Sequence, residues 1–284
     1  MTAIARRFVR MPILLLLLLA VGCTTQPSRE EYLQYEATLR SLGDLRTERA
    51  PLDAPFSNED LVRNFERIAL RGEVDIERSG SETNSKSLPL RRWEQPLRYR
   101  VLGSGATAQD RARIDVFMRR IGGLTGLPVV QAGSDANLLI LVTTPEERDA
   151  VSAALFARHP GLGVSFDTWR RSRRIVCAAT NLVAPDADRG YVFGLVIVGD
   201  EVSGLLRESC FHEEITQVLG LGNDHPEVRP SIFNDDEEFA LLTEHDEWLV
   251  RLLYHDRLRP GMTEDEALPI VREVIGQLRP EGER

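Results

Sequence analysis

The order of predicted helices and strands in this chain of 284 residues indicates an α+β domain over residues 88 to about 280. Two nearly all-apolar runs, 137–142 and 191–198, have the composition of strands that are buried on both faces. A helix with one apolar face is predicted before them at 109–121, and another follows them at 241–254. This alternation predicts a mixed sheet covered by helices, without internal repeats.

The first 87 residues are predicted to precede that domain. Residues 1–22 read as an export signal, and residues 23–87 as a tether with short helices. A helix over 30–42 is followed by Gly43, a residue that commonly ends helices. Ser57 and Asp60 have the spacing of a capping box, which predicts that a second helix begins there.

Local signals give the boundaries of the remaining elements. A first strand is expected at 93–102, where Pro96 favours an edge position or a bulge. The helix at 109–121 is expected to stop at the glycine pair 122–123, and Pro145 is expected at the first position of the next helix. A long helix is predicted over 201–219, with Gly220 as its C-cap. The last helix begins after Thr263, which has a capping-box partner in Glu266.

The first residues are typical of a bacterial lipoprotein signal. A short apolar stretch, 13–19, follows three arginines and precedes small residues that lead to Cys23. The stretch is too short to span a membrane, so Cys23 is predicted to be lipidated and to become the mature N-terminus. An ordinary secretory signal that is cut nearby is the alternative. Thr24 replaces the aspartate that usually marks inner-membrane retention, which favours the periplasmic face of the outer membrane.

The charge of the chain argues against a nucleic-acid partner. The net charge is −9, and removal of residues 1–22 takes away three arginines and no acid, which leaves −12. Nucleic-acid binding needs a basic surface. One basic cluster is present, and its simplest interpretation is a solvated hairpin or strand end: Arg170, Arg171, Arg173 and Arg174.

Two cysteines remain once Cys23 is assigned to a lipid. In an exported protein, Cys177 and Cys210 are expected to form a disulfide, although two buried thiols are the alternative. The bridge would close a loop of about 33 residues and stabilise the fold by about 3–4 kcal/mol. It would also fix the start of the 201–219 helix against the strand near residue 176.

An eleven-residue segment that begins in that helix, 213–223, has the spacing of a metallopeptidase zinc helix. The pattern H-E-x-x-H-x-x-G-x-x-H becomes Glu213-Glu214-x-x-Gln217-x-x-Gly220-x-x-Asn223. A helix places Glu213 and Gln217 on one face, and Gly220 would turn the chain so that Asn223 returns to the same point. Glu214 is then in the place of a general base. The register that starts at His212 would make Thr216 and Gly222 ligands, and neither suits zinc.

The changed ligands favour a different ion. One carboxylate and two amide oxygens form a hard oxygen site, which suits calcium, magnesium or weakly held manganese better than zinc. His212, Asp224 and His225 lie beside the motif and are candidates to join or replace these ligands. The acidic run 235–238 is interpreted as a solvated loop, with ion binding as the alternative.

Further residues carry a resemblance to a known family. Ser231-Ile232-Phe233-Asn234 resembles the tight turn beneath the metal in metzincin peptidases, with Phe233 in the methionine position, and Asp246 with Leu253-Tyr254 resembles the closing helix of matrixins. The block from Cys210 to Met262 is similar to domain of unknown function 2927, a family of proteobacterial envelope proteins grouped with zincin-type metallopeptidases. The resemblance implies a metzincin-like zincin domain over about 88–270.

Three functional hypotheses follow. The first is an envelope lipoprotein that binds a peptide or an envelope protein without cleaving it, because the zinc ligands are replaced. The second is an active metal-dependent peptidase with Glu214 as general base. The third is an interaction module in which the polar helix face only stabilises the fold. The sequence names no substrate and no oligomeric state.

Overall fold

The protein, seen as a computed structural model, is described at residues 27–72, 86–162, 176–185, 190–234 and 236–280. The export signal, Cys23 and the basic cluster at 170–174 lie outside these residues. Within them the elements are α1 (Arg29–Leu42), α2 (Asn58–Ala69), β1 (Leu97–Leu102), α4 (Ala108–Thr125), β2 (Val129–Gln131), β3 (Leu138–Thr143), α5 (Glu147–Arg158), β4 (Cys177–Val183), β5 (Tyr191–Gly199), α7 (Gly204–Gln217), α8 (Glu244–Leu253) and α9 (Glu264–Leu278).

The strands form one mixed sheet in the order β2-β1-β3-β5-β4. Neighbouring strands are parallel except for β4, which pairs antiparallel with β5. The apolar runs at 137–142 and 191–198 became the central strands β3 and β5, as expected. The position expected for the first strand was wrong: β1 lies inside the sheet. Pro96 lies just before β1, so its missing backbone N–H interrupts no hydrogen bond between the strands.

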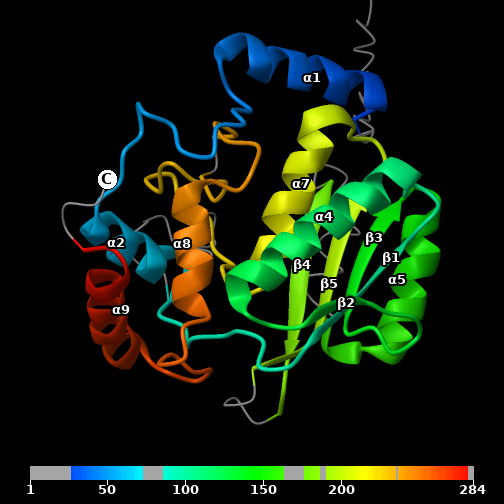
Figure 1. Ribbon diagram of the computed structural model, residues 1–284. Coiled ribbons are helices and arrows are strands. Elements are labelled where there is room, and N and C mark those ends of the chain that lie inside the picture. The colour runs from blue at the N-terminus through cyan, green and yellow to red at the C-terminus, as the bar shows by residue number, and fades with distance from the viewer. Residues whose placement is uncertain (1–26, 73–85, 163–175, 186–189, 235, 281–284) are drawn as a thin grey trace, which may run out of the picture.

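Helices cover both faces of this sheet (Figure 1). On one face α4 and α7 share the main core with β1 and β3, through side chains such as Ile114, Phe117 and Ile140. On the other face α5 covers a smaller apolar cluster that includes Leu155, Leu195 and Ile197. The helix α4 continues through the glycine pair at 122–123 and ends at Gly126 in the left-handed region, so its expected end was too early. Burial of Leu124 beyond the glycines favours this extra turn.

The helices α2, α8 and α9 pack together beside the sheet (Figure 1). Phe65 of α2, which belongs to the segment expected to be a tether, is fully buried in the same core as Trp93 and Leu249. Capping boxes begin α2 and α9 at Ser57 and Thr263, as the sequence predicts. The helix α5 begins at Glu147, two residues after Pro145. None of the helices in the described ranges combines the length and apolarity needed to cross a membrane.

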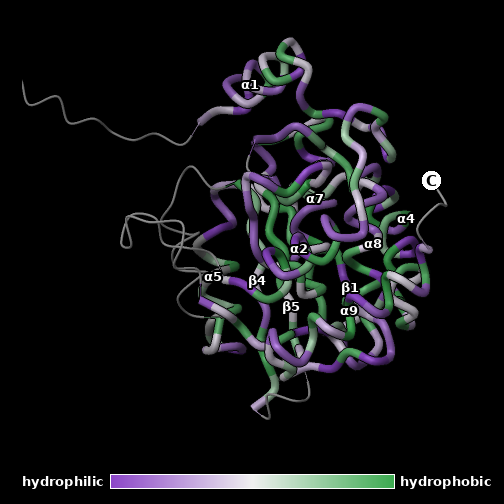
Figure 2. Tube along the Cα trace, turned by 90° about the vertical axis from the view of Figure 1, so that its left-hand side faces the viewer, coloured by the Kyte–Doolittle hydropathy of each residue, from purple (hydrophilic) through white to green (hydrophobic). Residues whose placement is uncertain are grey.

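The helix α1 lies at the periphery of the molecule, against the start of α7 (Figures 1 and 2). It ends at Gly43 in the left-handed conformation, as expected. Ser203, the N-cap residue of α7, makes no side-chain cap hydrogen bond. Instead, the carboxylate of Glu36 from α1 accepts from Leu205 N at 3.4 Å and Leu206 N at 3.5 Å. A carboxylate at a helix N-terminus satisfies unpaired amides and interacts favourably with the helix dipole.

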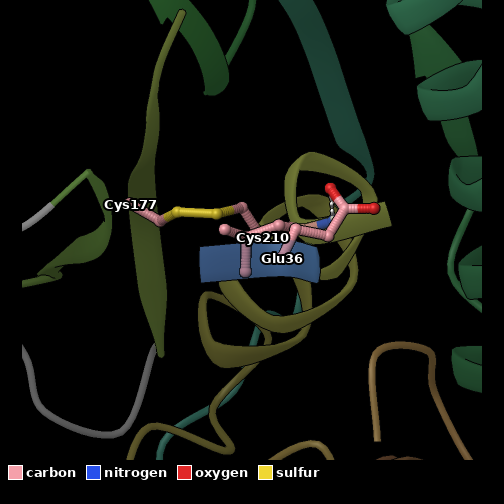
Figure 3. The surroundings of a disulfide bond; sticks show 4 residues. Glu36, Cys177 and Cys210 are labelled. Atoms are coloured by element: carbon pink, nitrogen blue, oxygen red, sulfur yellow. Dashed lines mark hydrogen bonds between the residues drawn. A yellow bond between two sulfur atoms is a disulfide. The ribbon is translucent and has the colours of Figure 1, made fainter. Parts of the chain in front are cut away.

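The disulfide predicted between Cys177 and Cys210 is present (Figure 3). It joins β4 to the middle of α7, and the two Cα atoms are 5.8 Å apart. The motif helix is therefore fixed at its start by α1 and at its centre by a sheet edge.

Candidate functional site

The motif helix ends earlier than its glycine. The α-helical residues of α7 stop at Gln217, Val218 is the C-cap, and Gly220 follows with a φ of 123°. A Cβ atom at Gly220 would lie 2.1 Å from the carbonyl oxygen of Arg91. The expectation that Gly220 caps the helix was therefore wrong. This position needs glycine because of its backbone conformation and because another backbone segment passes so close.

The three expected ligand positions do not point to one centre. Gln217 Nε2 donates to Asp224, at 3.2 Å from Oδ1 and 3.3 Å from Oδ2. The Asn223 side chain is buried and donates from Nδ2 to the carbonyl oxygen of Arg67 at 2.8 Å, at the end of α2. Asp224, rather than Asn223, thus lies beside the helix face that carries Gln217.

Glu213 lines a cavity of about 150 Å³. Its other walls are Asp224, Ile232, Asn234, Glu237 and Phe239, which come from the loops before and after the Ser231 turn. The cavity therefore carries three carboxylates and one amide, with two apolar side chains beside them. Of the positions that match the motif, Glu213 lines this cavity.

His212 belongs to the core. Its ring stacks on Phe117 with the centroids 4.0 Å apart, and its Nδ1 accepts from Leu242 N at 3.0 Å. Burial, with a smaller contribution from Arg120, lowers the pKa of His212 to about 3. The imidazole is therefore neutral at physiological pH and carries its proton on Nε2.

Glu214 and His225 are not among the residues that line the cavity. Glu214, the expected general base, is buried. His225 accepts at Nδ1 from Glu227 N at 3.1 Å, and its backbone amide donates to Phe233 O at 2.9 Å. His225 thus holds the loop that follows the motif against the Ser231 turn.

The Ser231 turn is held from below by a buried carboxylate. Asp246 accepts from Ser231 Oγ at 2.5 Å, from Ile232 N at 3.1 Å and from Thr243 N at 2.9 Å. Phe233 is fully buried and its amide donates to Ser231 Oγ at 3.0 Å. The turn is therefore a rigid part of the core, connected to the first turn of α8.

A histidine that the sequence analysis did not select extends this network. His245 lies 3.3 Å through Nδ1 from Asp246 Oδ1, and 3.0 Å through Nε2 from Asn64 Nδ2. Neither His245 nor Asp246 is exposed to solvent. Because Asn64 Nδ2 can only donate, His245 Nε2 accepts and Nδ1 carries the proton toward Asp246. The network connects α2, α8 and the Ser231 turn.

The residues do not fit a zinc centre of the metallopeptidase type. In the described parts of the chain, no three side chains of His, Cys, Asp or Glu are grouped so that they could hold a metal ion. Of the motif positions, Asn223 is committed to the backbone of α2, and Gln217 turns its amide nitrogen toward Asp224. We therefore derive no chemistry through a bound zinc ion.

Glu237 has an unusual environment in the cavity wall. Burial, together with the nearby charges of Asp236 and Asp44, raises its pKa. Its φ is 59°, in the left-handed region that residues other than glycine rarely adopt. Its carbonyl oxygen accepts from Leu45 N at 2.9 Å, so the N-terminal segment before α2 holds this conformation.

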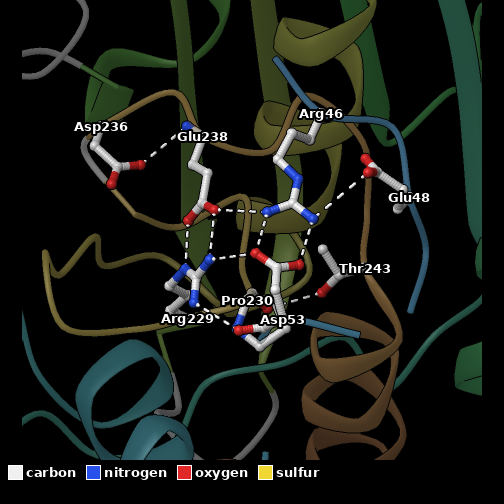
Figure 4. A network of polar contacts seen from close by, with 8 residues as sticks. All are labelled: Arg46, Glu48, Asp53, Arg229, Pro230, Asp236, Glu238 and Thr243. Atoms are coloured by element: carbon white, nitrogen blue, oxygen red, sulfur yellow. Dashed lines mark hydrogen bonds and ion pairs between the residues drawn. The ribbon is translucent and has the colours of Figure 1, made fainter. Parts of the chain in front are cut away.

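Ion pairs strengthen that attachment (Figure 4). Arg46 bonds to Asp53 at 2.7 Å and to Glu238 at 3.0 Å, and Arg229 bonds to the same two carboxylates at 3.1 and 2.6 Å. A parallel bridge between Arg46 and Phe239 continues the contact. We call residues 45–53 the clamp segment, since they hold the loop that forms one wall of the cavity.

The fold and the site together define an α+β protein in which a helix with zinc-motif spacing carries no histidine at its ligand positions. The chain belongs to the family described as "Protein of unknown function (DUF2927)", which matches residues 58–273. No curated protein and no solved structure matches the chain. The expected membership in this family is confirmed.

Asn234 is the cavity residue with the clearest unmet hydrogen-bonding capacity. It was expected only as part of the turn beneath the site. Its side chain is 8% exposed, and its buried Oδ1 has no hydrogen-bond partner among the described residues. Glu237 was seen only as part of the acidic run at 235–238. Charge density was the signal that could have selected it, but a charge run does not show which of its members turns inward.

Proposed function

We propose that this protein is exported, is anchored by a lipid at Cys23, and binds extended peptides in the cell envelope without cleaving them. The disulfide supports export, because such bonds persist in oxidising compartments. The motif spacing at Glu213 and the Ser231 turn support a domain related to zincins, and the family description adds nothing to this relationship. The catalytic alternative needs a group of side chains that together bind a metal ion, and the described residues contain no such group of His, Cys, Asp or Glu.

The observation that carries the non-catalytic proposal is the position of Asn223. A zincin-type hydrolase needs its third ligand to return to the helix face that holds the first two. Here the Asn223 side-chain amide donates to the carbonyl oxygen of Arg67 in α2. Glu214, which would activate water, is buried and is not among the residues that line the cavity. The motif helix keeps its place beside the sheet, but its polar face supports binding rather than metal chemistry.

The sheet edge beside the motif helix supports the choice of a peptide. Within the described residues, β4 has one strand neighbour, β5. Gly199 N donates to Val176 O at 2.7 Å, and alternate residues of an antiparallel strand bond inward and outward. Ala179 and Asn181 therefore turn their backbone amides toward the outer edge. An extended peptide that pairs with such an edge gains main-chain hydrogen bonds.

A pair of variants at Ala179 tests this proposal. Replacing Ala179 with proline removes an outward amide without removing a ladder bond to β5, and Ala179→Val adds bulk but keeps the amide. Peptides selected from a random phage-displayed library on the full chain should bind Ala179→Val as they bind the native protein. They should bind Ala179→Pro at least about tenfold more weakly. Failure to select any peptide, or equal binding by both variants, would contradict the proposal.

The selected peptides also test catalysis. They should remain intact on incubation with the native protein, and the Glu214→Gln variant should bind them equally well. Cleavage that a chelator stops and that Glu214→Gln abolishes would establish the peptidase alternative. Elemental analysis gives a second check, since one stoichiometric transition metal per chain would also favour the alternative.

The anchor is tested separately in cells. The native chain should incorporate labelled palmitate and fractionate with the outer membrane, and Cys23→Ala should lose the label. A native chain that is released without lipid would reduce the proposal to an ordinary secreted protein.

A further inference from the structure

We infer that residues 29–53, which comprise α1 and the clamp segment, form a strap that opens from the rest of the domain as one unit, and that its opening widens the cavity beside Glu213. Neither peptide binding nor a lipid anchor is needed for such a movement. The strap is attached by few buried side chains, its charged contacts can separate without stranding a charge, and its main contact with the domain is strained.

The strap buries little apolar surface. Its residues Leu39 and Leu45 are 7% and 3% exposed, whereas Leu42 and Leu52 are 72% and 98% exposed. Figures 1 and 2 show α1 at the outer margin of the molecule. The helix that follows the strap, α2, buries an apolar face of several side chains in the main core. Because burial of apolar surface is the main source of stability, the strap is held less firmly than α2.

The ion pair of Arg49 can open without leaving a charge unpaired. Arg49 of the strap bonds to the buried carboxylate of Glu247 at 2.6 Å, and Glu247 also pairs with Arg120 and Arg251. When Arg49 moves away into water, Glu247 therefore keeps two cations. Breaking a buried pair is costly mainly when it strands a charge, so this contact opposes opening only weakly.

The charges of the clamp segment separate in the same way (Figure 4). Within the strap, Arg46 makes two bonds to Asp53, at 2.7 and 2.9 Å. Within the rest of the domain, Arg229 makes two bonds to Glu238, at 2.6 and 2.8 Å. Opening breaks only the pairs that cross between these two groups. The paired bonds of Arg46 and Asp53 also hold the ends of the clamp segment together, so the segment can move as a unit.

Backbone strain is concentrated where the strap meets the domain. In the described ranges, Leu45 and Glu237 are the residues other than glycine with a positive φ, at 53° and 59°. Leu45 N donates to Glu237 O at 2.9 Å, so the two strained residues contact each other directly. Amino acids with a side chain avoid this conformation, and both residues can relax when the contact opens. The closed state therefore contains strain that favours opening.

The other end of the strap is attached through polar contacts of α1. Glu36 accepts from the first turn of α7 at 3.4 and 3.5 Å (Figure 3), and Arg29 Nη2 donates to Asp200 O at 2.6 Å. The Arg29 side chain is more than half exposed, so water and salt can replace its contact. A single residue separates Gly43, the C-cap of α1, from Leu45. Release of α1 should therefore loosen the clamp segment as well.

The strap holds two walls of the cavity. Glu237 and Phe239 line the cavity, and the clamp segment contacts both, through Leu45 N and through the bridge from Arg46. Glu213 lies on α7, which the disulfide joins to β4 independently of the strap. Opening therefore frees one side of the cavity and leaves the other in place. The cavity residues lie within the family match, which begins at residue 58, whereas the whole strap precedes it.

Hydrogen exchange of the full chain, followed for each amide by NMR, tests the movement. The reporters are amides whose hydrogen bonds cross between the strap and the rest of the domain: Leu45, Arg46, Ala240 and Glu244. Where exchange reports the opening equilibrium, these amides should share one protection factor, at least about a hundredfold below that of the β3 and β5 amides. An increase in salt from about 0.05 to about 0.5 M should lower it about threefold.

Variants at both ends of the strap test whether it moves as a unit. Glu36→Ala removes a contact of α1 with α7 and should lower the shared protection factor about two- to fivefold, the range expected for a carboxylate at a helix N-terminus. Arg272→Gln is the matched control, since it breaks an exposed ion pair with Glu59 outside the strap and should change nothing at the reporters. Glu237→Asn should raise the protection factor, because asparagine tolerates the left-handed conformation better.

A thiol in the cavity wall tests the second part of the inference. In Ile232→Cys, alkylation at residue 232 by N-ethylmaleimide, read by mass spectrometry, should be slow and should accelerate in Glu36→Ala by the same factor as the exchange. Asn234→Cys reports on the same cavity if Ile232→Cys does not fold. Alkylation at the rate of an exposed thiol, or at a rate that Glu36→Ala leaves unchanged, would show that the cavity opens without the strap.

Two exchange results would overturn the unit movement. One is a set of unequal protection factors among the reporters, and the other is protection as high as that of the sheet. An effect of Glu36→Ala that stops within α1 would likewise show local fraying. None of these results bears on peptide binding, which the Ala179 variants test separately.

Discussion

The Asp246 carboxylate below the Ser231 turn and the polar groups of the cavity wall beside the turn differ in how well their hydrogen bonds are satisfied. Below the turn, Asp246 accepts hydrogen bonds from Ser231, Ile232 and Thr243, and lies against His245. Beside the turn, the cavity wall contains the unsatisfied Asn234 Oδ1 and Glu237 with its raised pKa. Asp246, which has its donors, stabilises the turn, whereas the buried oxygens without a partner in the described residues, Asn64 Oδ1 and Asn234 Oδ1, cost stability.

The largest expected effect is the loss of the carboxylate below the turn. Replacing Asp246 with alanine leaves several buried donors without an acceptor, and we expect the free energy of unfolding to fall by about 4 kcal/mol. Urea denaturation of the purified protein measures this change. Asp236→Asn removes the charge of an exposed acid beside the cavity but keeps an oxygen that can accept from Glu238 N, and it should cost less than about 0.5 kcal/mol. Similar values for the two variants would contradict the distinction between the regions.

The second effect concerns the attachment of the motif helix. The double variant Cys177→Ser with Cys210→Ser should lower the free energy of unfolding by about 3–4 kcal/mol, because the bridge closes a loop of 33 residues. We also expect this variant to bind the proposed peptide more weakly. The disulfide joins β4 to the helix that carries Glu213, so its loss would loosen both the sheet edge and one wall of the cavity. Unfolding of native protein with and without reductant provides the control.

The third prediction uses pH. The pKa of His212 is about 3 in the folded protein, compared with an ordinary value of 6.5. Between these two values, His212 is protonated in the unfolded chain and neutral in the folded chain. Stability should therefore fall as the pH drops below about 6.5, by about 2 kcal/mol between pH 7 and pH 5. In His212→Asn, whose side-chain oxygen can still accept from Leu242 N, this loss should disappear.

A second group loses stability only at lower pH. Although burial raises the pKa of Glu247, hydrogen bonds from Arg49 and Arg120 outweigh it and bring the value to about 2. Its stabilising contribution is present above its ordinary 4.5 and is lost as the pH falls toward 2. Measurements at pH 7 and pH 5 avoid the titration of Glu247, and the difference between the native protein and His212→Asn separates His212 from His159, whose pKa burial also lowers. An unchanged slope in His212→Asn would show that another group titrates in this window.

The smallest effect is expected at Asn234. Leucine has nearly the same shape but no polar atoms, so Asn234→Leu should raise the free energy of unfolding by about 1 kcal/mol. Destabilisation by more than 1 kcal/mol would show that Asn234 supports the fold.

Local chemistry predicted much of the fold. The capping boxes at Ser57 and Thr263, the central strands and the disulfide follow from patterns within a few residues or from the oxidising compartment. The errors occurred where packing overrides local preference. Contacts of Leu124 carry α4 beyond its glycine pair, and β1 begins after Pro96 and so lies inside the sheet. The continuity of α2 with the main core also depends on long-range contacts.

The candidate site could be predicted only in part. Helical periodicity placed Glu213 and Gln217 on one face, and both lie near Asp224. The direction of Asn223 could not be predicted, because it depends on the carbonyl oxygen of Arg67, 156 positions earlier in the chain. The inward turn of Glu237 depends similarly on Leu45. Spacing rules describe a helix well, but they do not describe a loop whose shape is set by distant backbone partners.

The clamp segment has a practical consequence for recombinant work. The family match begins at residue 58, so a fragment trimmed to 58–273 would lack residues 45–53. Phe239, now 2% exposed, would lose the Arg46 guanidinium that lies 4.9 Å from its ring centre, and Ala240 N would lose its bond to Arg46 O. Such a fragment would expose apolar surface at Phe239 and would lack the contacts that hold one wall of the cavity. A ligand screen that failed on this fragment would therefore say little about the intact protein.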